Sequence, residues 1–566
     1  MEAVRSRCPS TSRKNGLGSP PQDHGSANPL CLACRSEAFR DFGLQHSGGA
    51  NFTAWPVRQF ATDLLGINRI CLLIVIKALY AVPMEISLNA RQPVVSDTGA
   101  PIGVRPGERA EIGLKLLAPQ GSLEKLREVP VTVQHARNRG AFRRLETVHY
   151  DTPERLLFQH GMSLRVRRNG KHFIQTLKLL PNSGQPLARR QWEAPVDGVT
   201  PDLARLPAEE VGDPVTTLTN DALVPVFAAK VRRRARQLDL PDASVEIVFD
   251  EGTIEAGARQ EVISEIKLEL KSGNAGVLFD LGTQLLDAAP LRVGTRSKAE
   301  RGFALAFDVV QPAAKAESFG ITAEHVVDDV IALLVGSCWH HLLRNHTVAE
   351  KGSDPEGVHQ MRVALRRLRT ICALFRRDVP APAFQAVNSE ARWLMQQLGP
   401  ARDWDVFDET TVTRLVTAAP DVDLGGLREA VEQQRKSSYG ALQTVLADPR
   451  CSRFLLSLGH LVERRGWRNE IDSEALAVLS QPMPTLADKI LARSHRKALK
   501  RGAHFRQLNI DAQHDLRIDI KKLRYAAEFF LPLYATQAPA KHYVKRLARL
   551  QASLGSARDI ASTRTI

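Results

Sequence analysis

The feature that most constrains the fold of this chain is a helical pattern that occurs twice. HQMRVALRRLR at 359–369 returns as HDLRIDIKKLR at 514–524. At about 100° per residue, a helix places the basic residues of each copy on one stripe and the apolar residues on another. The basic stripes are His359, Arg362, Arg366 and Arg369, and His514, Arg517, Lys521 and Arg524. The apolar stripes are Met361, Leu365, Leu368 and Cys372, and Leu516, Ile520, Leu523 and Ala527. A merely solvated face has no reason to keep the imidazole at the same helix angle in both copies.

A second repeated element supports an internal duplication. L-G-x-A-R-D occurs at 398–403 and again at 554–559, at nearly the same distance after the histidine of each copy. Helical apolar spacing predicts an all-α domain over 321–566 with halves at about 321–445 and 446–566. Such halves usually pack around a pseudo-twofold axis, which would bring both basic stripes to one surface. Asp403 and Asp559 each follow an arginine, which favours capping or ion pairing over catalysis.

The region 109–310 has mostly period two, which is typical of strands. In ISEIKLELKSG (263–273), charged residues share one face and apolar residues the other. Asn169-Gly170 predicts a hairpin turn, with Arg167 opposite His172 and Arg165 opposite Ile174. Parity puts Arg165, Arg167 and Lys178 on one face. An antiparallel sheet with one face exposed to water accounts for this pattern. The alternative is an antiparallel β-barrel whose lumen is lined by acids and bases together.

The amino-acid composition indicates which class of partner the protein binds. The formal net charge is +15, which favours acidic partners such as nucleic acid, anionic lipid or phosphorylated molecules.

Seven scattered cysteines do not form a disulfide framework and indicate a reducing cytoplasm. The apolar run at 70–82 is too short for a membrane span and contains Lys77. Residues 1–108 lack a sustained period and are expected to be disordered, with Met84 as a candidate later start, and 311–320 is expected to be a linker.

The strand motifs resemble the CYTH family of triphosphate tunnel metalloenzymes over about 109–310. The family's E-x-E-x-K strand is similar to 111–115, and its Y-x-D-T, L-x-R-x-R and T-x-K series is similar to 150–152, 164–167 and 176–178. Its R-x-E-x-E and E-x-E-x-E strands are similar to 189–193 and 265–269, and SKAERGF at 297–303 resembles a closing element of inorganic triphosphatases in that family. The resemblance implies a strand-built tunnel that binds triphosphate.

The resemblance also implies roles for individual residues. The catalytic set would be Glu111, Lys115, Arg165, Arg167 and Lys178, with Arg189, Arg233 and Lys298 holding further phosphate oxygens. Mg²⁺ or Mn²⁺ would be held by Glu111, Glu193, Asp250, Glu265 and Glu269. Gly113, Gln191 and Lys267 stand where the family has glutamate, and Lys267 would repel a divalent ion. The implied enzyme is therefore a weakened inorganic triphosphatase.

The region 321–566 resembles the CHAD domain, a duplicated helical module understood to bind inorganic polyphosphate. By this resemblance, the two basic stripes would bind polyphosphate, and the chain would act in the cytoplasm and on polyphosphate granules. Three functions stay open: a metal-dependent inorganic triphosphatase, a catalytically weakened polyphosphate-binding adaptor, and an adenylate cyclase or thiamine triphosphatase. Nucleic acid and membrane binding are disfavoured because the basic stripes contain almost no aromatic residues, Tyr525 alone following one copy.

Overall fold

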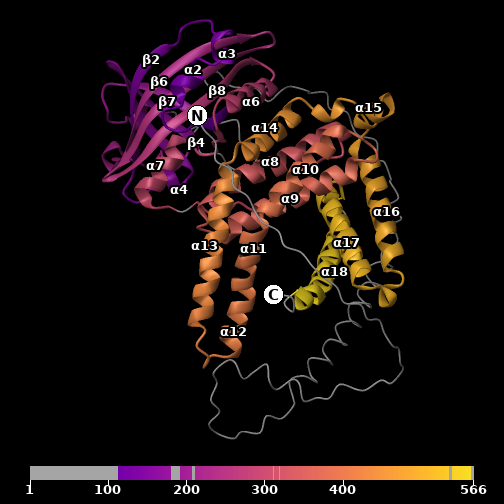
Figure 1. Cartoon of the computed structure of the whole chain (residues 1–566). Coiled ribbons are helices and arrows are strands. Elements are labelled where there is room, and N and C mark those ends of the chain that lie inside the picture. The colour runs from indigo at the N-terminus through magenta and orange to yellow at the C-terminus, as the bar shows by residue number, and fades with distance from the viewer. Residues whose placement is uncertain are drawn as a thin grey trace, which may run out of the picture. The chain divides into compact units, whose positions relative to one another are not determined.

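The computed structural model describes residues 112–179, 191–206, 211–309, 311–317, 319–534 and 538–562. The predictions for residues 1–108, Glu111 and Arg189 lie outside the described residues. The described residues comprise a sheet region followed by a helical region (Figure 1). The sequence predicts an antiparallel β-barrel tunnel followed by an all-α duplicated helical domain, and an antiparallel strand region followed by a helical region is confirmed.

The sheet region contains nine strands in one antiparallel sheet. They are β1 (Gly113–Leu117), β2 (Ala141–Asp151), β3 (Met162–Asn169), β4 (His172–Leu179), β5 (Gln191–Val196), β6 (Val224–Leu240), β7 (Ala243–Ala256), β8 (Arg259–Gly273) and β9 (Arg292–Val293). Their order is β5-β4-β3-β2-β6-β7-β8-β1-β9. Within the described strands no pairing joins β5 to β9, so the sheet is open rather than the backbone-closed barrel expected from the sequence.

The hairpin between β3 and β4 has a different register from the one predicted. Asn169 pairs with His172, so Arg167 lies opposite Ile174 and Arg165 opposite Thr176. The turn is made by Gly170, whose φ is +64°, and Lys171, and not by Asn169 and Gly170. Glycine adopts this left-handed conformation without the strain that a Cβ atom causes. The predicted opposite pairs are therefore wrong, but the shift is an even number of residues and each side chain keeps its face.

Short helices cover the sheet region and long helices build the rest. The sheet region carries α2 (Leu123–Arg127), α3 (Pro130–Val133), α4 (Leu156–Gln159), α6 (Gly276–Ala288) and α7 (Lys298–Phe307). The helical region comprises α8 (Val327–Lys351), α9 (Pro355–Phe375), α10 (Pro382–Gln397), α11 (Gly399–Val406), α12 (Thr413–Ala418), α13 (Gly425–Ala447), α14 (Pro449–Glu463), α15 (Ser473–Leu479), α16 (Met483–Gly502), α17 (Ile510–Phe530) and α18 (Ala538–Ser562). None of these helices is both long and apolar enough to cross a membrane.

The two repeated helices begin where local sequence caps them. The Asp354 carboxylate accepts a hydrogen bond from the Glu356 amide at the start of α9, where Pro355 is the first helical residue. The Asn509 side chain does the same for the Ala512 amide at the start of α17. The predicted apolar stripes of both helices are buried. The predicted amphipathic character of the two helices is therefore confirmed by the burial of their apolar stripes.

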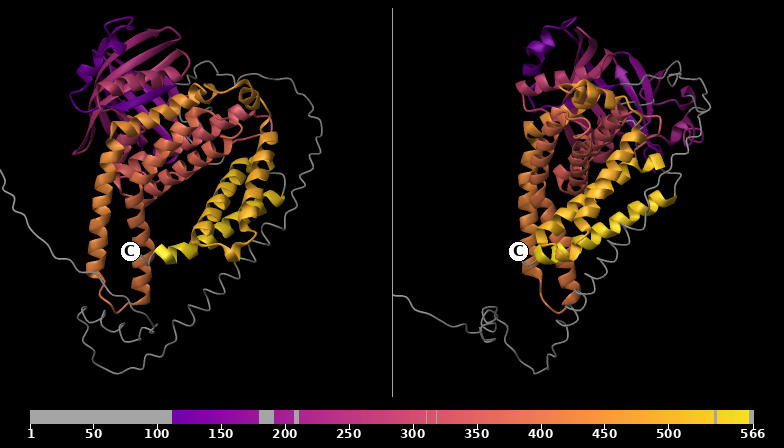
Figure 2. Two further views of the ribbon diagram at one scale, coloured as in Figure 1. Left: turned by 45° about the vertical axis from the view of Figure 1, so that its right-hand side comes forward. Right: turned by 90° about the vertical axis from the view of Figure 1, so that its right-hand side faces the viewer.

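Helices of the two regions share one hydrophobic core. Helix α14 lies beside the sheet region (Figure 2), where it packs directly on α6. Gly459 of α14 allows this approach, because a Cβ atom there would lie 2.2 Å from the ring of Phe279 in α6. Phe279 in turn meets Trp339 of α8 edge to face, with ring centroids 5.5 Å apart. The packing fixes α8 and α14 against the sheet region.

Candidate functional site

The charged faces of the strands meet around one cavity of about 780 Å³. Arg165 and Arg167 of β3, Lys178 of β4 and Glu193 of β5 line it from one side of the strand order. Lys115 of β1 and the charged face of β8 line it from the other side. Strands near opposite ends of the order therefore face one space, and the sheet curves around it without closing. The predicted common face of Arg165, Arg167 and Lys178 is confirmed.

Positive charge dominates this cavity. Among the described lining residues from the sheet region there are eight lysines and arginines and three carboxylates. The bases are Lys115, Arg165, Arg167, Lys178, Arg233, Lys267, Lys271 and Lys298, and the acids are Glu193, Glu265 and Glu269. Burial, followed by the charges of Arg165, Arg167 and Lys178, holds the pKa of His149 well below its usual value. His149 is therefore neutral near pH 7 and adds no charge to that of the lysines and arginines around it.

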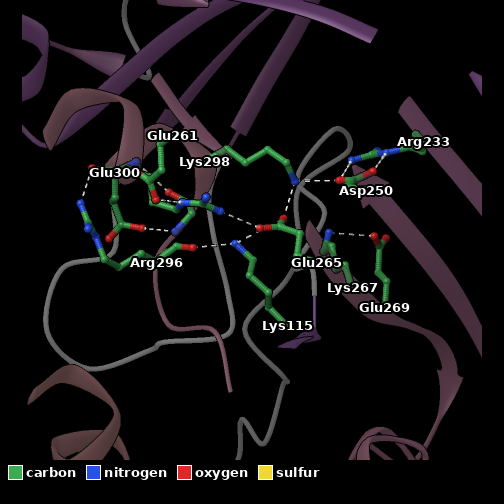
Figure 3. Close-up of polar contacts among 12 residues, drawn as sticks. Lys115, Arg233, Asp250, Glu261, Glu265, Lys267, Glu269, Arg296, Lys298 and Glu300 are labelled. Carbon is green, nitrogen blue, oxygen red and sulfur yellow. Dashed lines mark hydrogen bonds and ion pairs between the residues drawn. The ribbon is translucent and has the colours of Figure 1, made fainter. Parts of the chain in front are cut away.

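The buried acids beside the cavity are bound to basic side chains. Asp250 of β7 accepts two hydrogen bonds from Arg233, at 2.8 and 2.7 Å, and one from Lys298 at 2.7 Å. Burial opposes ionisation of Asp250, but Lys298 and Arg233 outweigh it and hold its pKa well below the usual range. Figure 3 shows Lys298 reaching from Asp250 to Glu265, so that one ammonium group bridges the two carboxylates (Figure 3).

Glu265 of β8 is the most heavily engaged of these acids. Besides Lys298, the Arg301 guanidinium lies 3.1 Å and the Lys115 ammonium 3.9 Å from its oxygens. Burial raises its pKa, but Lys298 and Lys115 together bring the net value below the ordinary one. Arg301 is in the SKAERGF element, whose Ser297 and Glu300 form a capping box at the start of α7. This element therefore positions both Lys298 and Arg301 against β8.

Glu269 and Glu193 have partners of their own. The Lys267 ammonium lies 3.0 Å from Glu269 (Figure 3). Glu269 also pairs with Lys271. The Thr176 hydroxyl donates a 3.2 Å hydrogen bond to Glu193. Within the described ranges, no group of three histidine, cysteine or carboxylate side chains is arranged to hold a metal ion. Three of the four described residues predicted to be metal ligands, Asp250, Glu265 and Glu269, are instead paired with lysines and arginines.

The second candidate site is the surface where the repeated helices α9 and α17 meet. Lys521 of α17 has a pKa lowered to about 8 by burial and then by Arg366, Arg517, Arg524 and Arg362. Two of these arginines belong to the first copy and two to the second. The expectation that the duplication brings both basic stripes together is therefore confirmed for these residues, which we call the paired basic surface.

Arg362 of this surface, and Arg369 further along the basic stripe of α9, donate hydrogen bonds to neutral groups. Arg362 donates to the Met395 carbonyl oxygen at 3.0 Å, and Arg369 donates to the Asn388 side chain at 3.1 Å. The buried Nε atom of Arg366 has no hydrogen-bond partner among the described residues. His359 and His514 are half-buried on the same helices. Arg524 is the exception, since it pairs with Glu528 as well as Gln551.

Comparison with known proteins identifies both regions. Residues 109–303 match the CYTH domain family, and residues 334–566 match the CHAD domain family. The chain contains a CYTH domain followed by a CHAD domain. Over 163 residues it is 32% identical to an inorganic triphosphatase of Haemophilus influenzae, a match covering 28% of this chain and 46% of the relative's length.

Two further relatives extend the comparison. An uncharacterised protein of Mycobacterium tuberculosis is 25% identical over 410 residues, covering 68% of this chain and 75% of that protein. A solved CHAD domain from the plant Ricinus communis is 31% identical, covers 44% of this chain and 81% of its own, and superposes with a TM-score of 0.37. The CYTH domain belongs to a family that binds or hydrolyses triphosphates, as the triphosphatase relative illustrates.

Some residues of the cavity were not identified from the sequence. Thr147, His149 and Ser163 also line it, as does Arg344 from α8 of the CHAD domain. Alternation along β2 could have identified the first two, because they share a face with Leu145 of the lining. Nothing in the local sequence of α8 indicates that Arg344 lies at the CYTH cavity.

Proposed function

We propose that the CYTH cavity binds inorganic triphosphate or the end of a linear polyphosphate chain. The observation that carries this proposal is the convergence of eight basic side chains, seven from strands and Lys298 from α7, on one cavity with only three described carboxylates from the sheet region. Arginine forks and lysine ammonium groups match the closely spaced oxygens of a phosphate chain. Arg165 and Arg167 contact one stretch of the chain, while Lys115, Lys267 and Lys298 contact another.

The arrangement fits binding better than metal-assisted hydrolysis. Triphosphatases with a CYTH domain generally depend on a metal. Here Lys298 and Lys267 neutralise the carboxylates that a divalent ion would need, and Lys267 stands between Glu265 and Glu269 on one face of β8. Binding by these lysines and arginines requires no metal, and we propose that turnover is slow.

Calorimetric titration with sodium tripolyphosphate tests the binding proposal. The full chain is titrated in the presence of a chelator at two salt concentrations. Binding without metal, weaker at higher salt, is the expected result because the contacts are ionic. Arg165→Ala should weaken binding at least tenfold, whereas Arg144→Ala, an exposed arginine of β2, should leave it unchanged. Binding that appears only after a divalent ion is added would overturn the proposal.

A second candidate function is metal-dependent hydrolysis of inorganic triphosphate. The identity to the Haemophilus influenzae inorganic triphosphatase favours it. Phosphate release from tripolyphosphate with Mg²⁺ or Mn²⁺, measured against a metal-free control, decides between the two. Release well above the control would establish the hydrolase, and parallel assays with ATP and thiamine triphosphate would separate the cyclase and thiamine triphosphatase alternatives.

For the CHAD domain we propose that the paired basic surface binds inorganic polyphosphate. Lys521 among four arginines is a focus of positive charge that a polyanion would neutralise. A protein with this surface would collect on polyphosphate granules in the cytoplasm. Competition between long-chain polyphosphate and single-stranded DNA or RNA tests the choice of polymer. Failure of polyphosphate to displace the nucleic acid would favour a nucleic-acid-binding protein instead.

A further inference from the structure

The CYTH cavity has a wall that the CYTH domain does not supply. Besides the strands, it is lined by four residues of α8, the first long helix of the CHAD domain: Trp339, His340, Leu343 and Arg344. Residues spaced by three and four positions share one side of a helix, so His340, Leu343 and Arg344 form one face. This face is turned towards the cavity, and it contains one permanently charged group.

The position of α8 is fixed by packing on both sides of the cavity wall. Trp339 is buried against Phe279 of the CYTH domain, and Arg464 of the CHAD domain donates to Asp280 at 3.0 Å. Glu350, near the end of α8, pairs with Arg292 of β9. Since Trp339 and Glu350 of α8 both contact the CYTH domain, the cavity-facing side chains of α8 belong to the same binding space as the strand residues.

Arg344 is the cation of this wall. Burial and the neighbouring Arg344 lower the pKa of His340 to about 4, so the imidazole is neutral near pH 7. Arg344 itself is 51% exposed, and it pairs with Glu317, which is 39% exposed, in the segment that joins the two domains. An ion pair with both partners this exposed to water contributes little to stability. The guanidinium can therefore turn from Glu317 to an anion in the cavity at small cost.

We infer that Arg344 of the CHAD domain is a phosphate-binding residue of the CYTH cavity. The inference rests on the proposed binding of triphosphate there. It means that the binding site is complete only in the two-domain protein. The helical domain would then have two separate contacts with phosphate chains, one at the cavity and one at the paired basic surface.

The test compares Arg344→Ala with Glu317→Gln by calorimetric titration with tripolyphosphate on the full chain. Both variants remove the same ion pair, but only the first removes the cation. Arg344→Ala should weaken binding about tenfold and flatten its salt dependence, because one ionic contact is lost. Arg344→Lys should restore part of the affinity. Glu317→Gln should bind as tightly as the parent or more tightly, because the competing carboxylate is gone.

The outcomes separate this inference from the function on which it rests. Equal loss of affinity and of melting temperature in Arg344→Ala and Glu317→Gln would make the pair structural and overturn the inference. Normal binding by Arg344→Ala, with binding lost in Arg165→Ala, would also overturn it while leaving the proposed function intact. No binding of tripolyphosphate by the parent chain would overturn the proposed function itself.

Discussion

The CYTH cavity and the paired basic surface of the CHAD domain hold positive charge in opposite ways. In the cavity, lysines and arginines lie against buried carboxylates, and the Asp250–Lys298–Glu265 bridge is the clearest example. At the paired basic surface, Lys521 lies among four arginines, and burial, followed by their charges, lowers its pKa to about 8. A carboxylate beside a buried cation offsets the cost of removing both charges from water, whereas like charges placed together add to that cost. We therefore expect the cavity to hold a short phosphate chain in a fixed position, and the paired basic surface to accept a longer polyanion.

The largest effect expected from this difference is on stability. Glu265→Gln leaves Lys298, Lys115 and Arg301 short of a negative partner in a buried network. We expect a loss of roughly 3 kcal/mol or more in the free energy of unfolding, because breaking a buried ion pair leaves uncompensated charge. Thermal and denaturant unfolding measure it. Added tripolyphosphate should stabilise this variant more than the parent, since the ligand supplies the missing charge.

The matched control is Glu251→Gln, which breaks an ion pair of similar length on the exposed side of the sheet. Arg232 and Glu251 are 2.7 Å apart with side chains 61% and 37% exposed. The expected loss is below about 1 kcal/mol. Equal losses in the two variants would mean that the cavity network is no more important to the fold than a surface pair.

The contrast between the two sites also shows where sequence reasoning succeeds. Periodicity of two placed Lys267 and Glu269 on the cavity face of β8, and helical periodicity placed Arg362 and Arg366 on the basic stripe of α9. Both are local properties of one element, and a strand or helix carries them wherever it packs. The order of the charged strand motifs was likewise sufficient to indicate one charged compartment.

The exact turn of the hairpin and the contacts between distant elements could not be predicted. The hairpin register was wrong because it depends on which two residues form the turn, and Gly170 with Lys171 does so here. The pairing of Glu265 with Arg301 depends on how α7 docks on β8. The contribution of Arg344 depends on the packing of α6 against α14, which no residue near position 344 encodes.

The next largest effect is expected on the metal requirement of the cavity. Lys267→Glu replaces the ammonium that pairs with Glu269 and creates three adjacent acidic positions on one face of β8. Metal-free binding of tripolyphosphate should weaken by more than about tenfold, because a favourable charge becomes a repulsive one. Mn²⁺ should now increase tripolyphosphate affinity and phosphate release. If the variant behaves like the parent with and without Mn²⁺, Lys267 is not the group that replaces a metal ion.

A smaller effect is expected from the arginines of the paired basic surface. The double change Arg362→Ala and Arg366→Ala should weaken long-chain polyphosphate binding about tenfold and reduce its salt dependence. Tripolyphosphate binding at the cavity should not change. Arg428→Ala, an exposed arginine of α13, serves as the control for net charge. If loss of Arg428 weakens polyphosphate binding equally, the domain responds to overall charge and not to the surface where the copies meet.

The smallest expected effect is a change in the protonation of Lys521 when polyphosphate binds. Its folded-state pKa of about 8 lies below the ordinary lysine value of 10.5, so between these limits the unfolded chain holds a proton that the folded chain has released. Stability contributed through this group therefore rises with pH across that window. Burial is the largest cause of the shift, and a bound polyanion would offset the contribution of the surrounding arginines and so raise the pKa of Lys521. At about pH 8.5, polyphosphate binding should take up a fraction of one proton.

Calorimetry in two buffers of different ionisation enthalpy measures that uptake. It should vanish in Lys521→Met and persist in Lys541→Met, which removes an exposed lysine of α18. It should also vanish near pH 6, where Lys521 is already protonated in the free protein. Uptake that persists in Lys521→Met would place polyphosphate away from the meeting point of the two copies. The cavity would then be the only described site in which phosphate binding has a structural basis.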